Sequence, residues 1–328
     1  MSSSCTSRAS TGSGCGRRRS SIVTTTSRAT CASPPMRRPC CATWRGSAGT
    51  TGGGATPDVR RLVVNADDFG LSPGVNEGIL EAHAAGVVSS VSVLVNAPGW
   101  EHAVAALRRA GAELGAGLHL NLVAGEPMGG GRSLVHPRTG RFHGLAGLVT
   151  RALTGRIDPD HVAEECAAQL ARLRAVGVRV THVDSHRHVH ALPGVWGPVV
   201  ATARAHGVPF VRVPVEHGAG RAWAKRWTIG AAWRVAARGV AVPRHADRFH
   251  GIGLHGDVRF LERLLALVDR LRPGITELMV HPGRPDRALA AWDGYVASRA
   301  AELAALTSSA ARERLGRGDV GLTHFGAV

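Results

Sequence analysis

Two adjacent carboxylates, Asp67 and Asp68, follow a short apolar segment of the sequence. The residue types from Leu62 to Asn65 predict a buried β-strand, and Gly70 begins the turn that ends it. In parallel α/β folds the loops after the strands converge at the carboxyl ends, so the pair is placed where such folds gather their chemistry. Neighbouring residues of a strand point to opposite faces of the sheet. Asp67 and Asp68 can therefore serve one site only if the backbone turns at this point, and the nearby Gly70 allows such a turn at little energetic cost. The alternative is that one aspartate caps the next helix and the other is solvated.

A second polar cluster has a spacing of two residues. Its members are His182, Asp184, His186, His188 and His190. Because the side chains of an extended segment alternate between faces, these five would all point the same way. A single strand histidine is usually a hydrogen-bonded core residue, but five aligned polar groups buried without partners would each cost about 1 to 3 kcal/mol. The pattern therefore favours a metal site or an acid–base site.

Two further histidines lie in strand-like segments. His119 is surrounded by apolar residues and glycines, and His281 stands between an apolar segment and a Pro-Gly turn. Together with Asp68 and His186, they place carboxylate and imidazole groups at the ends of successive strands. One aspartate and two histidines that leave open positions are a recognised ligand set for a catalytic divalent metal. Asp184 is placed to orient one of these imidazoles.

Strand and helix patterns alternate from residue 59 onward. Strands are expected at 62–65, 87–96, 114–122, 178–183, 209–213 and 276–281, and helices at 75–86, 100–110, 161–176, 195–206 and 258–271. This alternation predicts a parallel sheet or barrel with right-handed crossovers. Residues 124–155 and 215–256 break the pattern and are expected to be lids or substrate loops. The last helical region, 292–315, is expected to pack on the outside.

The first 56 residues differ in composition from the rest. They contain no Asp or Glu, eight arginines and five of the six cysteines. Such a segment buries too little apolar surface to offset its ordering entropy, so residues 1–57 are predicted to be a disordered basic tail and residues 58–328 a folded domain. The composition matches an organellar transit peptide, but we favour a wrongly assigned start or a functionless extension.

Several classes of protein are disfavoured. The cysteines show no zinc or disulfide pattern, and Cys166 falls on the apolar face of a predicted helix, which indicates a reducing, cytoplasmic compartment. No run of about 18 apolar residues occurs, so no membrane span is expected. The net charge of +16 would suit a nucleic-acid-binding protein, but half of it lies in the tail. The other basic residues alternate with acidic ones and have no known motif or aromatic platform beside them, so we expect no nucleic-acid partner.

The motifs resemble the YdjC family of carbohydrate deacetylases, which includes chitooligosaccharide deacetylases and hopanoid-biosynthesis relatives. The resemblance is carried by residues 65–72 (NADDFGLS), 117–119 (GLH), 181–190 (THVDSHRHVH) and 280–283 (VHPG), and it extends over about residues 60–326. It implies a distorted (β/α) barrel related to polysaccharide deacetylases, with parallel strands and outer helices. It also implies one divalent metal ion, Mg or Zn, bound by Asp68, His119 and His186. Asp67 corresponds to the general base and His281 to the general acid.

The activity implied by this resemblance is hydrolysis of the N-acetyl group of an amino sugar or oligosaccharide, with release of acetate. His188 and His190 are expected to contact substrate hydroxyls, to support the ligands from behind as Asp184 does, or to be structural. Arg187, of opposite parity, is expected in a surface ion pair. Family members are often dimers, so a homodimer is one expected assembly. The alternative is another metal-dependent hydrolase on a similar barrel, acting on a phosphoester or a cyclic amide.

Overall fold

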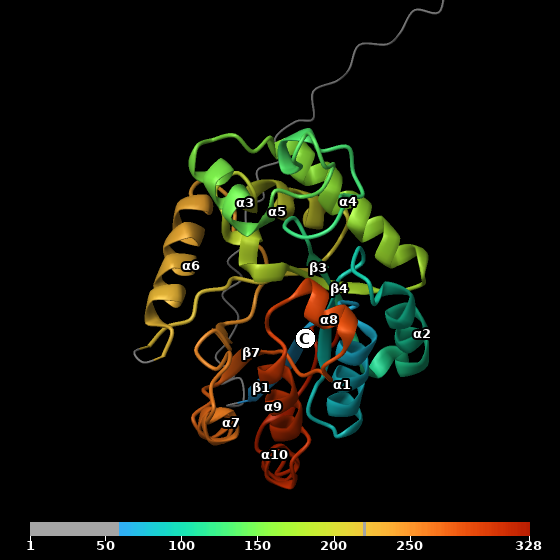
Figure 1. The fold of residues 1–328 in the computed structure, drawn as a ribbon. Coiled ribbons are helices and arrows are strands. Elements are labelled where there is room, and N and C mark those ends of the chain that lie inside the picture. Colours follow the sequence, from blue (N-terminus) through green and yellow to red (C-terminus); the bar gives the residue numbers. More distant parts are fainter. Residues whose placement is uncertain (1–58, 219–220) are drawn as a thin grey trace, which may run out of the picture. The chain divides into compact units, whose positions relative to one another are not determined.

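Parallel strands form the centre of the fold, which a computed structural model describes for residues 59–218 and 221–328 (Figure 1). The tail predicted at residues 1–57 lies outside the described residues. The strands are β1 (Arg60–Phe69), β2 (Ser90–Val93), β3 (Gly115–Leu120), β4 (Val180–Ser185), β5 (Phe210–Val211), β6 (Arg248–His250), β7 (Gly274–Val280) and β8 (Gly321–Leu322). They pair in parallel in the order β5-β4-β3-β2-β1-β7-β6, and β8 pairs with the beginning of β1.

The sheet curls toward closure. A parallel bridge joins Phe210 of β5 to Arg244, which precedes β6, and so brings the two ends of the strand order toward each other. Helices surround the strands (Figure 1). The predicted distorted (β/α) barrel with parallel strands and outer helices is therefore confirmed.

Ten α-helices and three 3₁₀ segments lie in the described residues. The helices are α1 (Pro73–Ala84), α2 (Trp100–Ala110), α3 (Gly144–Leu153), α4 (Pro159–Ala175), α5 (Trp196–Ala205), α6 (Trp223–Ala236), α7 (Phe260–Asp269), α8 (Arg287–Trp292), α9 (Ala297–Leu306) and α10 (Ser309–Leu315), with 3₁₀ segments η1 (Gly111–Glu113), η2 (Arg132–Leu134) and η3 (His186–Ala191). Side chains cap the starts of α1, α4, α8 and α10. Ser72 caps α1, where its hydroxyl accepts from Val75 N at 3.2 Å and a proline follows. Asp158 caps α4 in the same way. Within residues 59–218 and 221–328, no helix has the length and apolar character needed to cross a membrane.

The central strand carries the two aspartates into the interior. β1 is buried from Leu62 to Phe69 because β2 and β7 pair with its two edges. The sequence of a parallel strand that is covered on both faces is nearly continuously apolar. This pattern is the one that predicted a strand at residues 62–65. Asp67 and Asp68 lie at its end and are each only 2% exposed.

The two segments that were predicted to be irregular contain regular structure. Residues 124–155 include η2 and α3, and residues 215–256 include α6 and β6. Trp233 of α6 packs against the main hydrophobic core. The prediction of irregular loops was therefore wrong for these helices, because tertiary packing overrides the weak local signal of Gly-rich segments.

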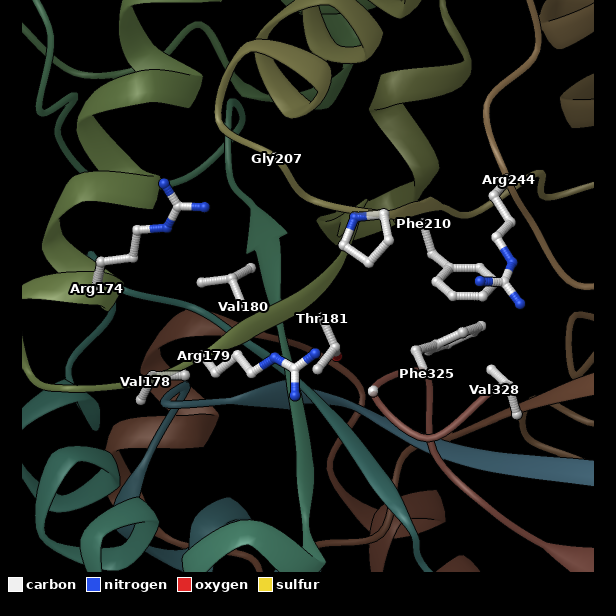
Figure 2. Close-up of a pocket in the computed structure, with 12 residues that line it drawn as sticks. Arg174, Val178, Arg179, Val180, Thr181, Gly207, Phe210, Arg244, Phe325 and Val328 are labelled. Carbon is white, nitrogen blue, oxygen red and sulfur yellow. The ribbon is translucent and has the colours of Figure 1, made fainter.

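A separate pocket lies beside the starts of β4 and β5 (Figure 2). It has a volume of about 550 Å³, and its walls include Arg174, Arg179 and Arg244. Arg244 lies 4.5 Å from the centre of the Phe210 ring, and Phe325 in turn lies 5.0 Å from Phe210, centre to centre. The C-terminal segment thus packs under the amino ends of the strands. The lining residues of this pocket differ from those of the pocket at the carboxyl ends of the strands.

Candidate active site

The three predicted metal ligands, Asp68, His119 and His186, meet near the carboxyl ends of β1, β3 and β4. Asp68 Oδ1 lies 2.7 Å from His186 Nδ1 and 3.3 Å from His119 Nε2. The candidate ligand atoms of all three residues lie within 4.8 Å of one another, and the three side chains are buried. One carboxylate and two imidazoles that converge in this way form a donor set for a divalent metal ion. The residues present therefore fit the ion that the resemblance implies.

The pKa values of Asp68 and His119 are shifted in opposite directions. Burial alone would raise the pKa of the Asp68 carboxyl, but His186 and Arg299 hold it well below its usual value. Burial alone would lower the pKa of His119, but the carboxylates of Asp184 and Asp67 raise it to about 10. At neutral pH Asp68 is therefore ionised and His119 protonated, so a metal ion that used His119 as a ligand would displace its proton.

The backbone turns at Asp68 itself. Asp68 has a φ of +68°, and the register between β1 and β2 shifts around it. Aspartate tolerates this left-handed conformation better than most residues, and the turn lets Asp67 and Asp68 line the same pocket. Gly70 has a φ of +98°, and a Cβ atom there would lie 2.3 Å from the Leu94 carbonyl oxygen. Asp68 and Gly70 therefore both contribute to the turn, whereas the sequence predicted it at Gly70.

Asp67 forms a bidentate ion pair with Arg212. The two terminal nitrogens of Arg212 each donate to an Asp67 oxygen at 2.7 Å, and Asn65 Nδ2 donates to the same carboxylate at 2.8 Å. Burial raises the pKa of Asp67 and Arg212 opposes the shift, with a net rise. A buried carboxylate with a raised pKa is suited to accepting a proton. Arg212 was missed from the sequence, although a lone arginine in the apolar segment 209–213 was the available signal.

Arg212 also connects Asp67 to two other buried carboxylates. Arg212 Nη2 lies 2.7 Å from Asp184, and Arg212 Nε donates to Glu277 at 2.7 Å. Burial would raise the pKa of Asp184, but Arg212 and His119 lower it far below its usual value. Burial raises the pKa of Glu277 to about 7 in spite of Arg212. The positive charge of Arg212 thus compensates the neighbouring carboxylates, whose burial without a cation would be costly.

Asp184 lies behind the metal-binding group. Its Oδ1 is 2.7 Å from His119 Nδ1, and its Oδ2 accepts from Ser92 Oγ at 2.6 Å. A proton on His119 Nδ1 donates to this carboxylate, which leaves Nε2 to face Asp68. This contact is the one expected of a residue that orients a metal ligand.

The polar segment after β4 does not remain extended. The 3₁₀ segment η3 begins at His186, and Arg187 and His188 have φ values of +58° and +56°. The prediction that residues 182–190 share one face was therefore wrong beyond His186, because the strand ends there. Arg187 forms an ion pair with Asp293 at 3.1 Å.

The other histidines of this cluster have different surroundings. Both ring nitrogens of His190 are hydrogen-bonded inside the barrel wall. His182 Nε2 lies 3.0 Å from Ser92 Oγ, deeper in the barrel. His188 lines the pocket, and its Nδ1 has no hydrogen-bond partner among the described residues. Burial lowers the pKa of all three, so they are neutral.

His281 follows β7 and lines the same pocket as Asp67 and Asp68. Its backbone N–H donates to Glu302 Oε2 at 2.6 Å, and its ring lies edge-on to His255 with a centroid distance of 4.9 Å. Burial, together with the neighbouring His255, lowers the pKa of His281 well below its usual value. A neutral imidazole both donates and accepts, so His281 is able to pass on a proton that it first receives.

The last helical region reaches the site. Arg299 of α9 is fully buried and donates to Asp68 Oδ2 at 2.5 Å and to Asp293 Oδ2 at 3.0 Å. The expectation that residues 292–315 pack on the outside was therefore wrong for this residue. Burying a guanidinium requires carboxylate partners, and these lie inside the barrel mouth.

The pocket that contains these residues has walls of two kinds. Its volume is about 680 Å³. The polar wall holds the aspartates and histidines described above. The apolar wall comes from α3, η3 and α6 and includes Leu145, Val149, Val189, Ile229 and Ala232.

The fold and the site define an α/β barrel in which Asp68, His119 and His186 converge beside Asp67 and His281 at the carboxyl ends of the strands. Residues 61–317 match the family described as YdjC-like protein, and the chain belongs to this family. A carbohydrate deacetylase of Mus musculus is 40% identical over 246 residues, which cover 69% of this chain and 78% of the relative. A chitooligosaccharide deacetylase of Serratia marcescens is 38% identical over 254 residues, which cover 75% of this chain and 90% of the relative.

A solved structure supports the fold. A protein from Enterococcus faecalis V583 assigned to cellobiose-phosphate cleavage has a TM-score of 0.66 and 26% sequence identity. The match covers 82% of this chain and 98% of the Enterococcus chain.

Proposed function

We propose that this protein is a metal-dependent hydrolase that removes N-acetyl groups from an acetylated amino sugar or oligosaccharide and releases acetate. The observation that carries the proposal is the convergence of Asp68, His119 and His186 beside Asp67 and His281 in one pocket. The relatives described as carbohydrate deacetylases support the same activity.

The residues divide the chemistry among them. A divalent ion held by Asp68, His119 and His186 would polarise the acetamide carbonyl as a Lewis acid. Asp67 accepts the proton of the attacking water, and the bidentate pair with Arg212 fixes the orientation of its carboxylate. The departing sugar nitrogen needs a proton, since an unprotonated amine is a poor leaving group. The proton that Asp67 takes from the water is passed through the pocket to His281, which donates it to that nitrogen, so that one proton leaves the water and one reaches the amine.

The polar neighbours have supporting roles in this proposal. Asp184 fixes the orientation of His119 through a hydrogen bond. His190 Nε2 hydrogen-bonds the backbone carbonyl of Arg212 and so stabilises the backbone that carries this arginine. His188 contacts the sugar hydroxyls, which is supported by its unpartnered Nδ1 on the pocket surface. We propose zinc or magnesium as the ion, with the two imidazoles favouring zinc. A cytoplasmic location is in keeping with the buried free thiol of Cys166, and a homodimer is the proposed assembly.

An acetate assay tests this function. The purified chain is stripped with a chelator, reloaded with zinc or magnesium, and incubated with N-acetylated chitooligosaccharides. Acetate and free amine should appear in equal amounts only after reloading. Absence of acetate from every N-acetylated sugar in the panel would overturn the proposal.

The Enterococcus structure favours a second candidate, cleavage of a phosphorylated sugar. The same metal-loaded protein is assayed on cellobiose phosphate for release of glucose, which reports cleavage of the glycosidic bond, and for release of phosphate, which reports cleavage of the phosphoester. Either product without acetate release from N-acetylated sugars would select this candidate. The higher identity of the deacetylase relatives, 38% to 40% against 26%, makes N-deacetylation the first choice.

A further inference from the structure

Large apolar side chains are exposed around the mouth of the catalytic pocket. Of the eight large apolar residues that are exposed in the described part of the chain, five lie on α3 and α6: Leu145, Leu153, Trp223, Trp227 and Val235. Leu153, Trp223 and Trp227 are 73%, 69% and 67% exposed. Exposed tryptophans in such a group are unusual on a soluble surface and mark an interaction site. We call the solvent-facing sides of α3 and α6 the rim.

The rim is continuous with the pocket. Leu145, Val149 and Leu153 follow one another at intervals of four residues on α3, and all three line the pocket. Ile229 and Ala232 of α6 line the same pocket. Both helices contact η3, and Figure 1 shows α3 and α6 on the same side of the barrel. A partner that covers the rim therefore also faces the entrance to the site.

The sequence segments that contain α3 and α6 are basic, although Arg226 of α6 is buried against Glu216 and Arg244 lies in the separate pocket. The sequence from residue 127 to 157, which contains α3, has five arginines and no Asp or Glu. The sequence from residue 217 to 246, which contains α6, has six Arg and Lys residues and again no Asp or Glu. Arg234 and Arg238 are exposed, and Arg234 lies in the same stripe of α6 as Trp223 and Trp227. The complementary partner is therefore anionic and has an apolar layer.

We infer that the rim docks onto the surface of an anionic lipid bilayer. Tryptophan and leucine insert at the boundary between head groups and acyl chains, while arginine and lysine bind lipid phosphates, which is the pattern of an interfacial helix. A second copy of this chain is a poorer occupant, because a two-fold interface would place two acid-free basic surfaces against each other. The pocket then opens toward the bilayer, where an N-acetylated sugar carried on a lipid reaches the site.

Vesicle partition tests the docking. The intact chain is sedimented with vesicles made of equal parts phosphatidylcholine and phosphatidylglycerol, and with vesicles of phosphatidylcholine alone. The double variant Trp223→Ser/Trp227→Ser should partition at least about tenfold less onto the anionic vesicles. The partition of the double variant Arg234→Glu/Arg238→Glu onto anionic vesicles should fall about tenfold, and its partition onto neutral vesicles should change little. All variants are first compared by circular dichroism and thermal unfolding.

Two matched controls separate the rim from the basic tail, which every variant retains. Val258→Ser removes an apolar side chain that is 97% exposed elsewhere, and Arg108→Glu/Arg109→Glu reverses two exposed charges on α2. Both should partition within about twofold of wild type if the rim is the docking surface. Equal partition of rim variants and controls would overturn the inference.

Two further measurements address the occupant. Lipids labelled with a quencher in the acyl chain should quench the tryptophan fluorescence of the wild type, and Trp223→Ser/Trp227→Ser should lose this quenching. If light scattering instead shows a dimer that this variant splits, with vesicle partition unchanged, the rim is a self-association surface and the inference fails. Partition is measured without turnover, so its result is independent of the proposed deacetylation.

Discussion

Arg299 Nη2 donates to Asp68 Oδ2 at 2.5 Å and so links α9 to the end of β1 across 231 residues of sequence. The other carboxylate oxygen, Oδ1, faces His119 and His186. Arg299 therefore occupies one oxygen of Asp68 and leaves the second for a metal ion. This contact brings α9 to the candidate site and orients the carboxylate that we propose as a metal ligand.

Replacement of Arg299 should weaken metal binding while the ligands remain. In Arg299→Met the Asp68 carboxylate loses the partner that orients it, and metal affinity should fall about 10- to 100-fold. Isothermal titration with zinc measures the change. Arg312→Met, an exposed arginine of α10, is the matched control and should bind zinc like the wild type. Equal affinities in both variants would show that Arg299 has only a structural role.

Replacement of Asp67 should separate metal binding from turnover. Asp67→Asn keeps the size of the side chain but cannot accept the proton, so acetate release should fall by about 10²- to 10⁴-fold. Metal content, measured on the purified protein, should stay at the wild-type level because Asp67 is not among the proposed ligands. A variant that loses its metal, or that turns over at the wild-type rate, contradicts the assignment of Asp67 as base.

Replacement of His119 should abolish both properties. His119→Ala removes an imidazole from the metal group and frees Asp184 from its hydrogen bond, so metal content and acetate release should both be lost. His245 is exposed and its Nδ1 lies 2.8 Å from the Pro243 carbonyl oxygen, so His245→Ala provides the control. Full metal content in His119→Ala would remove the ligand assignment.

Local patterns were enough to find much of the site. Asp67 and Asp68 end an apolar strand before a turn, and His119 lies in a second strand, so their convergence follows from parallel topology alone. His186 was also found, although the two-residue spacing that pointed to it ends with the strand, and Arg187 turns into a left-handed conformation.

The partners of these groups could not be found in the same way. Arg212 and Arg299 are identified by the carboxylates that they contact, 145 and 231 residues away, and no local period encodes such pairs. The helices α3 and α6 were missed because the segments around them are interrupted by Gly, Pro and His, which hide short helical patterns that packing on the core stabilises.

Arg212 should be essential for stability. In Arg212→Met the carboxylates of Asp67, Asp184 and Glu277 would remain buried without their common cation. Breaking a buried ion pair from one side costs about 3 to 5 kcal/mol of unfolding free energy. Urea denaturation measures the loss, and Arg312→Met should change the unfolding free energy by less than about 0.5 kcal/mol. A similarly small change in Arg212→Met would mean that these carboxylates are protonated and need no partner.

The pH dependence of stability should carry a contribution from Glu302. Burial raises the pKa of this carboxyl from 4.5 to about 7, although it accepts hydrogen bonds from the Tyr295 hydroxyl and the His281 backbone. Below pH 4.5 the group is protonated in both the folded and the unfolded chain. As the pH rises toward 7, the unfolded chain loses the proton first, so this contribution to stability is present at low pH and is lost by about pH 7.

Substitution of Glu302 isolates this contribution. Glu302→Gln cannot ionise, so between pH 4.5 and about 7 the wild type should lose about 3 kcal/mol of unfolding free energy relative to the variant. Urea denaturation at intervals across this range gives the difference directly, and other titrating groups cancel because both proteins contain them. Glu313→Gln, at an exposed position of α10, should show no such trend. A wild-type to Glu302→Gln difference that stays constant with pH would mean that Glu302 is ionised in the folded protein, with Arg299 as its nearest compensating cation.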